Sequence, residues 1–138
     1  MKLDIELVRQ IMLSLEDGTW YNDHCHWIIK NANIKDLSYY RKVNQLDREI
    51  IIYNHIKYCI ECGLIAQATV IFTLCGEASA DIHRAKLTPY GHEFLNSSRK
   101  NEVWDKLKSL DFENLSLAEV ISFGKKLSIK WIEKKLNI

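Results

Sequence analysis

A helix end followed by a β-hairpin is the pattern that most constrains this chain. Gly63, which opens a Gly-Leu-Ile sequence, can adopt the left-handed backbone conformation that ends a helix. Residues 68–74 and 81–87 then alternate between apolar and polar side chains, as paired strands do. The turn, expected inside 74–80, contains a glycine and polar residues, as a hairpin turn should. We therefore expect one antiparallel hairpin directly after a helix.

The hairpin is followed by a well-defined helix start in LTPYGHEFL at 87–95. Thr88 can cap this helix, and Pro89 takes the first helical position, which proline favours. A helix, a hairpin and a returning helix form the second half of a winged helix-turn-helix domain. We therefore expect an α+β, mostly helical fold of this type, with the hairpin as its wing and an extra C-terminal helix.

Other segments show the three-and-four apolar spacing of amphipathic helices. We expect helices over 3–16, 47–62, 89–110 with a break near 96–98, and about 116–136. Ser116 and Glu119 have the spacing of a capping box at the start of the last helix. Residues 18–46 have no clean period, and we expect one short strand and one short helix there. The whole chain, 1–138, is expected to form a single domain with a winged-helix core over about 1–110.

Charge is almost balanced, with 19 basic and 18 acidic residues and a net charge of +1. A nucleic-acid-binding domain usually has a clear positive excess, so any binding face would depend on the local distribution of charge. The N-terminal sequence MKLDIELVRQ lacks the apolar run of a signal peptide, and no stretch reaches the roughly 18 apolar residues of a transmembrane helix. We therefore expect a soluble, cytoplasmic protein without membrane contact, in which the four cysteines are reduced.

Four segments together resemble a known family. The chain opens MKLDIELVRQIML and continues with YNHIKYCIECGLI at 53–65, LTPYGHEFL at 87–95 and NEVWDKLK at 101–108. They are similar to segments of a family of uncharacterised bacterial and phage proteins. That family has a Met-Lys-x-Asp start followed by a hydrophobic-Val-Arg helix. It also has a Tyr-x-His…Gly-Leu-Ile helix and a Leu-Thr-x-x-Gly-x-x-Phe-Leu segment where the wing leads into the next helix. The resemblance implies a domain of unknown function with winged-helix character. It supplies no catalytic residues.

The expected fold suggests a DNA-binding surface. In a winged helix-turn-helix domain the second helix of the pair enters the major groove, which would be the helix at 47–62. Asparagine can pair with adenine, and lysine or arginine can reach guanine or phosphate. The candidate contacts on this helix are Arg48, Asn54, Lys57 and Tyr58, and those on the wing are His83, Arg84 and Lys86. We therefore expect a DNA-binding regulator from a bacterium, a phage or another mobile element.

A protein–protein adaptor on the same scaffold is the alternative. Asp47, Glu49 and Glu61 on the 47–62 helix would repel phosphate. The three isoleucines at 50–52 make the start of this helix unusually apolar. A continuous positive surface joining the helix to the wing would favour DNA binding, and an apolar or mixed patch would favour the adaptor.

The C-terminal helix is rich in lysine. Lys126, Lys130 and Lys134 form a row at four-residue spacing, which is either a solvated face that complements the helix dipole or a contact for phosphate or a partner. The apolar stripe of the same helix could pair with a second copy, so a homodimer is a candidate assembly.

Histidine and cysteine side chains raise the alternatives of a metal site and an enzyme. His24, Cys25 and His26 could join Cys59 and Cys62 as zinc ligands. However, Cys59 and Cys62 lie within the expected 47–62 helix, and Cys59 lies on its apolar stripe, where free cysteine is common. We therefore expect no metal.

Catalysis is not indicated either. We expect His55 and His92 to be packed or capping residues rather than acid–base groups. The sequence contains no evident nucleophile–base set, Gly-rich phosphate loop or paired carboxylates. We expect neither an enzyme nor a cofactor.

Overall fold

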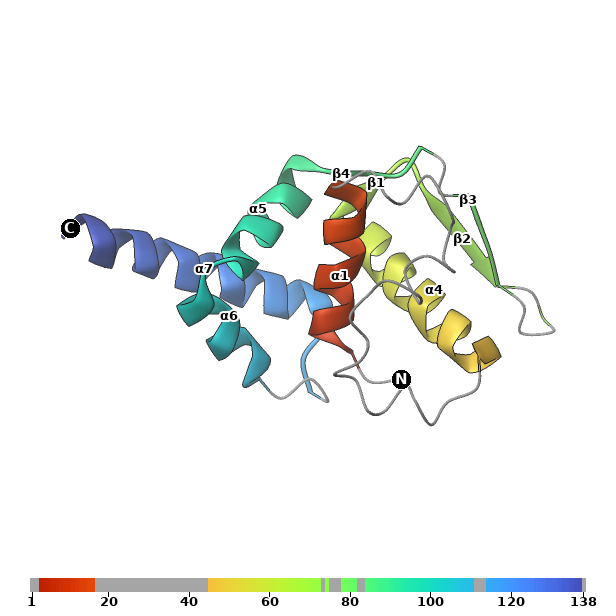
Figure 1. Cartoon of the computed structure of the whole chain (residues 1–138), viewed down its shortest axis with the longest axis horizontal. Helices are drawn as coiled ribbons and strands as arrows, with labels where there is room; N and C mark the ends of the chain where they lie inside the picture. The colour runs from red at the N-terminus through yellow and green to blue at the C-terminus, as the bar shows by residue number, and fades with distance from the viewer. Residues whose placement is uncertain are drawn as a thin grey trace.

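The computed structural model describes residues 3–16, 45–72, 74, 78–81, 84–110 and 114–137 (Figure 1). These residues form five helices and two two-stranded antiparallel sheets, which confirms the predicted α+β, mostly helical class. The helices are α1 (Ile5–Glu16), α4 (Gln45–Glu61), α5 (Pro89–Ser98), α6 (Asn101–Lys108) and α7 (Leu117–Leu136). The strands are β1 (Ile65–Ala66), β2 (Thr69–Phe72), β3 (Ala78–Asp81) and β4 (Lys86–Leu87). The strand and helix expected within 18–46 lie outside the described residues, apart from Gln45 and Leu46, which begin α4.

The hairpin is antiparallel as predicted, but its second arm is divided. β2 pairs with β3, from Thr69 opposite Asp81 to Phe72 opposite Ala78. β4 pairs instead with β1, the strand that directly follows α4. The prediction of a single strand over 81–87 is therefore wrong. Residues 82–85 separate β3 from β4, whereas only 67–68 separate β1 from β2, so the two pairings cannot share one register.

The C-terminus of α4 has the structure that Gly63 predicts. Gly63 has a φ of 78°, in the left-handed region. Its N–H donates to the carbonyl of Ile60 (3.1 Å), and the N–H of Leu64 donates to the carbonyl of Cys59 (2.9 Å). This pair of hydrogen bonds is a Schellman motif, which satisfies the last carbonyls of the helix. The chain therefore turns sharply out of α4 and brings Leu64 and Ile65 into the core.

The N-terminus of α5 is attached to this same helix end. The Thr88 hydroxyl accepts a hydrogen bond from the N–H of Gly91 (2.9 Å), which confirms the predicted cap, and donates to the carbonyl of Gly63 (2.5 Å). The Thr88 N–H donates to the carbonyl of Leu64 (3.0 Å). The contact is so close that a Cβ atom at Gly91 would overlap the carbonyl oxygen of Leu64. Only glycine fits at this position.

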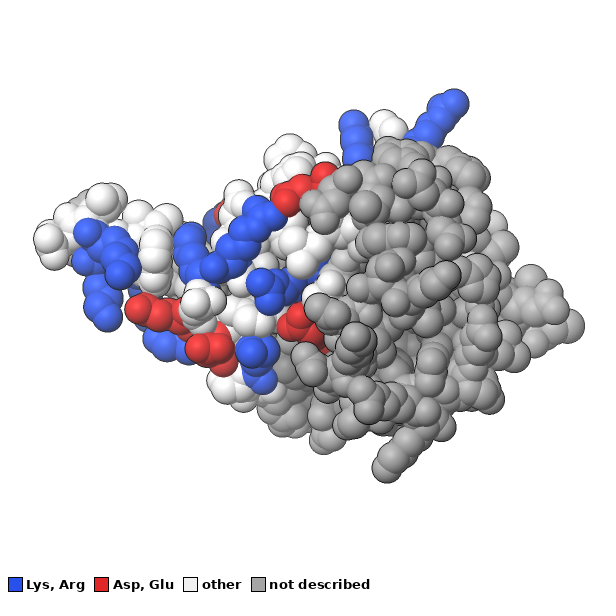
Figure 2. All heavy atoms as spheres, in the orientation of Figure 1, with Lys and Arg blue, Asp and Glu red and all other residues white. Residues whose placement is uncertain are grey.

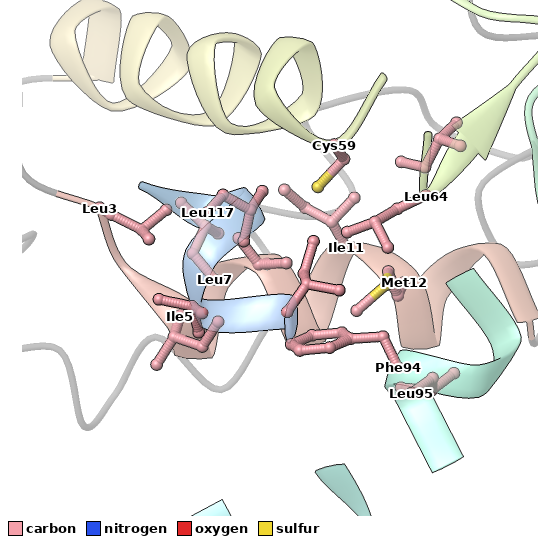
Figure 3. Close-up of a cluster of buried hydrophobic side chains, with 14 of the residues drawn as sticks. Leu3, Ile5, Leu7, Ile11, Met12, Cys59, Leu64, Phe94, Leu95 and Leu117 are labelled. Carbon is pink, nitrogen blue, oxygen red and sulfur yellow. The ribbon is translucent and has the colours of Figure 1, made fainter. Parts of the chain in front are cut away.

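The core surrounds α1, which lies between α4 and α5 (Figure 1). Each predicted apolar stripe contributes buried side chains to one cluster, part of which is shown in Figure 3. The described members from the helices include Leu7, Val8, Ile11, Met12, Ile52, Ile56, Cys59, Phe94, Leu95, Val103, Trp104, Leu107, Leu117, Val120 and Ile121. Burial of this cluster is the main force that holds the helices together.

The expected break in the 89–110 helix lies at Arg99 and Lys100, slightly later than the sequence indicated. Lys100 is extended, with φ −85° and ψ 112°, and separates α5 from α6. Before the break, the buried Ser97 hydroxyl donates to the carbonyl of Glu93 (3.0 Å) and accepts from the hydroxyl of Ser128 on α7 (2.7 Å). The break lets α5 and α6 both pack along α7, whose predicted Ser116–Glu119 capping box is present.

His55 joins α4 to the start of α1. Its ring is fully buried. Nδ1 lies 2.8 Å from the carbonyl oxygen of Ile51, and Nε2 accepts from the N–H of Asp4 at 2.9 Å. Because a carbonyl can only accept and an N–H can only donate, these partners select the neutral tautomer with its proton on Nδ1. Burial lowers the pKa of His55, although the hydrogen bond to Ile51 and the charge of Asp4 oppose this effect. The expectation of a packed histidine is confirmed for His55, whereas His92 is exposed on α5.

Replacing Gly91 with alanine should destabilise the fold, because the new methyl group would separate α5 from the end of α4. We expect a loss of about 1–3 kcal/mol in the free energy of unfolding, the usual cost of overpacking. Gly124→Ala is the matched control: a Cβ there lies 3.4 Å from the nearest atom of the Leu107 side chain, an ordinary contact, and alanine favours the helix. Urea unfolding measures both variants. Equal effects would contradict the steric role of Gly91.

Stability should fall in mild acid because of His55. Its pKa is lowered in the folded state, so between that value and about 6.5 the unfolded chain binds a proton that the native state does not. The free energy of unfolding should therefore decrease as the pH falls below about 6.5, by at most about 1.4 kcal/mol per pH unit. Urea unfolding between pH 7 and pH 5 measures this slope. His55→Asn should reduce it, and an unchanged slope would show that another group is responsible.

Candidate nucleic-acid interface

Lys57 is the candidate residue that connects α4 to the hairpin. Its side chain is exposed, and Nζ lies 5.7 Å from the centre of the Phe72 ring at the end of β2. The same Nζ lies 4.0 Å from a carboxylate oxygen of Glu61, one helical turn further on. Both partners of this ion pair are largely exposed, so the pair itself contributes little free energy. Lys57 therefore remains available to an anion that approaches α4 and β2 together.

Asn54 and Tyr58 are only half exposed. Asn54 lies one helical turn before Lys57 and can share its side of α4. Tyr58 packs edge-on against the buried His55 ring, with 5.6 Å between the ring centres. Tyr58 therefore contributes to packing more than it is available to contact DNA bases. For Arg48 the structure describes only the backbone, in the first turn of α4.

Basic residues of the wing gather at the opposite end of the hairpin. Arg84 is exposed and lies beside Gln67, Ala68 and Thr69, where β1 passes into β2. Lys86 is exposed on β4 opposite Ala66. Figure 2 shows basic side chains projecting from this end of the molecule. The described candidates therefore form two groups, Lys57 near the hairpin turn and Arg84 with Lys86 at its base, while His83 lies outside the described residues.

The hairpin also carries exposed apolar side chains that sequence reasoning missed. Ile71 on β2 is 62% exposed, and Leu74, just beyond β2, is fully exposed. Strand alternation could have identified Ile71, because it shares a face with Thr69, which is exposed as well. This end of the hairpin thus presents two large apolar side chains to solvent.

The lysine row on α7 borders two separate hollows. Lys126, Lys130 and Lys134 are all exposed, as predicted. Lys130 and Lys134 line a hollow between α6 and α7, together with Trp131. Lys126 lies instead beside a separate apolar hollow that includes Phe123. A contact of these three lysines with phosphate or a partner stays a prediction.

The far half of α7 exposes Ile129, Ile132 and Leu136, whose spacing places them on one side of the helix. This half extends away from α1 and α4 (Figure 1). The homodimer through α7 stays a prediction.

The cysteines are arranged for packing. Cys59 is completely buried, and its sulfur points into the apolar cluster in Figure 3. Burial raises the pKa of the Cys59 thiol far above its usual value. Burial, and then the charge of Glu61, raise the pKa of Cys62. Burial therefore opposes the loss of the thiol proton that metal binding requires. His24, Cys25, His26 and Cys75 lie outside the described residues.

Among the described residues, no three or more histidine, cysteine, aspartate or glutamate side chains cluster so that they could hold a metal ion. Within the same ranges, no helix combines the length and the apolar character needed to cross a membrane. The prediction that the protein is not an enzyme remains untested.

Comparison with known proteins identifies the family. Residues 2–114 match the model of the family DUF2513, a domain of unknown function described as a hypothetical protein. The chain belongs to this family, which confirms the resemblance to a domain of unknown function. No match was found among curated proteins or among solved structures.

Protein purified without added zinc should contain much less than one equivalent of the metal, because Cys59 is enclosed in the core and both thiols resist ionisation. Elemental analysis measures the content. Cys62→Ser is the informative variant, since Cys62 is only half buried. Near-stoichiometric zinc that is lost in this variant would contradict the packing role of the pair.

Proposed function

We propose that this member of the DUF2513 family is a DNA-binding protein of winged helix-turn-helix type. In this proposal α4 is the recognition helix, the β2–β3 hairpin is the wing, and the protein regulates transcription in a bacterium, a phage or another mobile element. The observation that carries it is the exposed Lys57 ammonium group, which lies on α4 directly against Phe72 of β2. A positive charge thus lies on the solvent face of the helix, where the helix contacts the hairpin. A domain of this type needs such a charge, because its recognition helix enters the major groove while neighbouring segments contact the DNA backbone.

The order of elements supports the same proposal. α4 ends in a Schellman turn, the hairpin follows directly, and the chain returns into α5 beside that turn. The base of the hairpin is therefore fixed relative to α4. Arg84 and Lys86 lie at this base and could contact phosphates on one side of a groove, while Lys57 and Asn54 face its floor. Two separated basic groups fit a duplex, which presents phosphates along its whole length.

A protein-adaptor function is the second candidate, and the exposed side chains of Ile71 and Leu74 favour it. Large apolar groups at the end of a hairpin gain nothing from facing phosphate, but they fit the apolar centre of a protein interface. In this alternative, Lys57 and its partner Glu61 would form part of the polar rim.

Lys57→Ala tests the DNA-binding proposal. If Lys57 contacts a phosphate, its loss should weaken binding to every duplex sequence and reduce the slope of log K against log salt by about one unit. Asn54→Ala should instead relax the preference at one base pair, with a loss of about 1–3 kcal/mol of discrimination. Gel shifts on a library of selected sites, repeated at several salt concentrations, separate the two effects.

Lys126→Ala is the matched control, because it removes an equally exposed lysine from a surface remote from α4. It should leave both the affinity and the salt slope close to those of the wild type. If the wild-type chain binds no duplex DNA at low salt, where even non-specific phosphate contacts register, the proposal is wrong and the adaptor function becomes the leading candidate.

A further inference from the structure

The contact between α6 and α7 contains a small hollow with an apolar floor. Val103 of α6 with Leu127 and Trp131 of α7 form this floor. Its volume is about 110 Å³. A closed cavity of roughly 150 Å³ takes up benzene, so this hollow has room for about one apolar side chain. Trp131 and Leu127 are only half buried, although both pack against the main cluster.

Lysine side chains surround this hollow. Lys106, Lys130 and Lys134 line it directly. The ammonium groups of Lys100 and Lys135 lie 5.1 and 5.5 Å from the centre of the Trp131 ring. On the face in Figure 2, basic side chains gather over α7 and its contact with α6, beside a smaller acidic group.

Positive charges outnumber negative ones among the residues that line the hollow. Glu102 is the one carboxylate among them. Glu133, the other acidic residue in this half of α7, neighbours Lys130 on the helix surface but does not line the hollow. The hollow is thus an apolar site for one side chain, enclosed by a field of positive charge.

We propose that the hollow between α6 and α7 binds an acidic peptide segment of a partner protein. One apolar side chain of the segment occupies the hollow against Val103 and Leu127, beside Trp131. Carboxylates on either side of it pair with Lys106, Lys130 and Lys134. Burial of the apolar group gives affinity, and the charges accelerate association and select acidic sequences.

Nucleic acid fits these observations less well. A phosphate backbone has no apolar group to place in the hollow. Base stacking would need an open aromatic face, but two ammonium groups already lie over the Trp131 ring. A carboxylate beside the hollow, from Glu102, would also repel closely spaced phosphates. An acidic peptide can place its charges apart from Glu102 and still bury its apolar side chain.

This inference is independent of DNA binding at α4. The hollow lies on α6 and α7, whereas the DNA-binding proposal uses α4 and the hairpin at the other end of the molecule (Figure 1). Failure of one proposal leaves the other intact, because no residue belongs to both surfaces.

Selection of peptides tests the inference. The full chain is exposed to a random peptide library displayed on phage, in parallel with the Lys130→Glu/Lys134→Glu double variant and the control Lys125→Glu. All three lysines are exposed on α7, but Lys125 lies beside Glu93 of α5 and does not line the hollow. Wild-type chain and Lys125→Glu should enrich peptides with one large apolar residue among several acidic ones. The double variant should lose this enrichment, although circular dichroism should show an unchanged helix content.

A peptide from the selection is then synthesised with a fluorescent label for anisotropy measurements. Replacement of its apolar residue by alanine, or of its acidic residues by glutamine, should each weaken binding by about tenfold, which corresponds to about 1.4 kcal/mol. Enrichment that survives in the double variant, or no acidic–apolar enrichment at all, would overturn the proposal. So would displacement of the peptide by single- or double-stranded DNA with the same lysine dependence, which would assign the site to nucleic acid. A dimer in light scattering that dissociates only in the double variant would assign it to a second copy of the chain.

Discussion

The contact between the first turn of α5 and the end of α4 determines how the rest of the structure is arranged. One hydroxyl, that of Thr88, caps α5 and binds the carbonyl of Gly63, so the start of one helix and the end of another share a hydrogen-bonding group. Gly91 allows the two backbones to touch. The segment 64–87 must therefore begin and end beside the contact between α4 and α5. A hairpin is the simplest structure that does this, and its base is held beside α4 whatever its turn contains.

The sequence segments that resemble the family contact one another in pairs where helices meet. The aspartate of the opening motif donates its N–H to the histidine of the Tyr-x-His motif. Arg9 of the opening helix lies 4.8 Å from the ring centre of Trp104, in the NEVWDKLK segment. The Gly-Leu-Ile and Leu-Thr-x-x-Gly motifs meet at Thr88. These segments thus specify how the helices dock. The family match assigns no chemistry to them, because the family is a domain of unknown function. The proposed peptide site depends on α7, which lies beyond the matched residues 2–114.

Features governed by neighbouring residues could be predicted from the sequence. The left-handed Gly63, the Thr88 cap and the Ser116 capping box each depend on hydrogen bonds within a few residues. The bounds of the second hairpin strand could not be predicted, because they depend on pairing with β1 across about twenty residues of chain. The hollows on α7 could not be predicted for a similar reason. A helical row predicts one face from Lys126 to Lys134, but which hollow each lysine borders depends on residues that distant segments place beside it.

A net charge of +1 conceals the difference between the two proposed surfaces. On α4 the exposed Lys57 is paired with Glu61. A phosphate that took the place of Glu61 beside Lys57 would therefore be repelled by the Glu61 carboxylate, which lies one helical turn away. Recognition there would need Arg84 and Lys86 to supply most of the attraction, at the other end of the hairpin. Around Trp131 the lysines outnumber the single carboxylate of Glu102 that lines the hollow. Among the described residues, positive charge is therefore denser around the α6–α7 hollow than beside Lys57. The two proposals are compatible in one chain, because screening at physiological salt limits the range of the lysine field to about 8 Å and the two surfaces lie at opposite ends of the molecule (Figure 1).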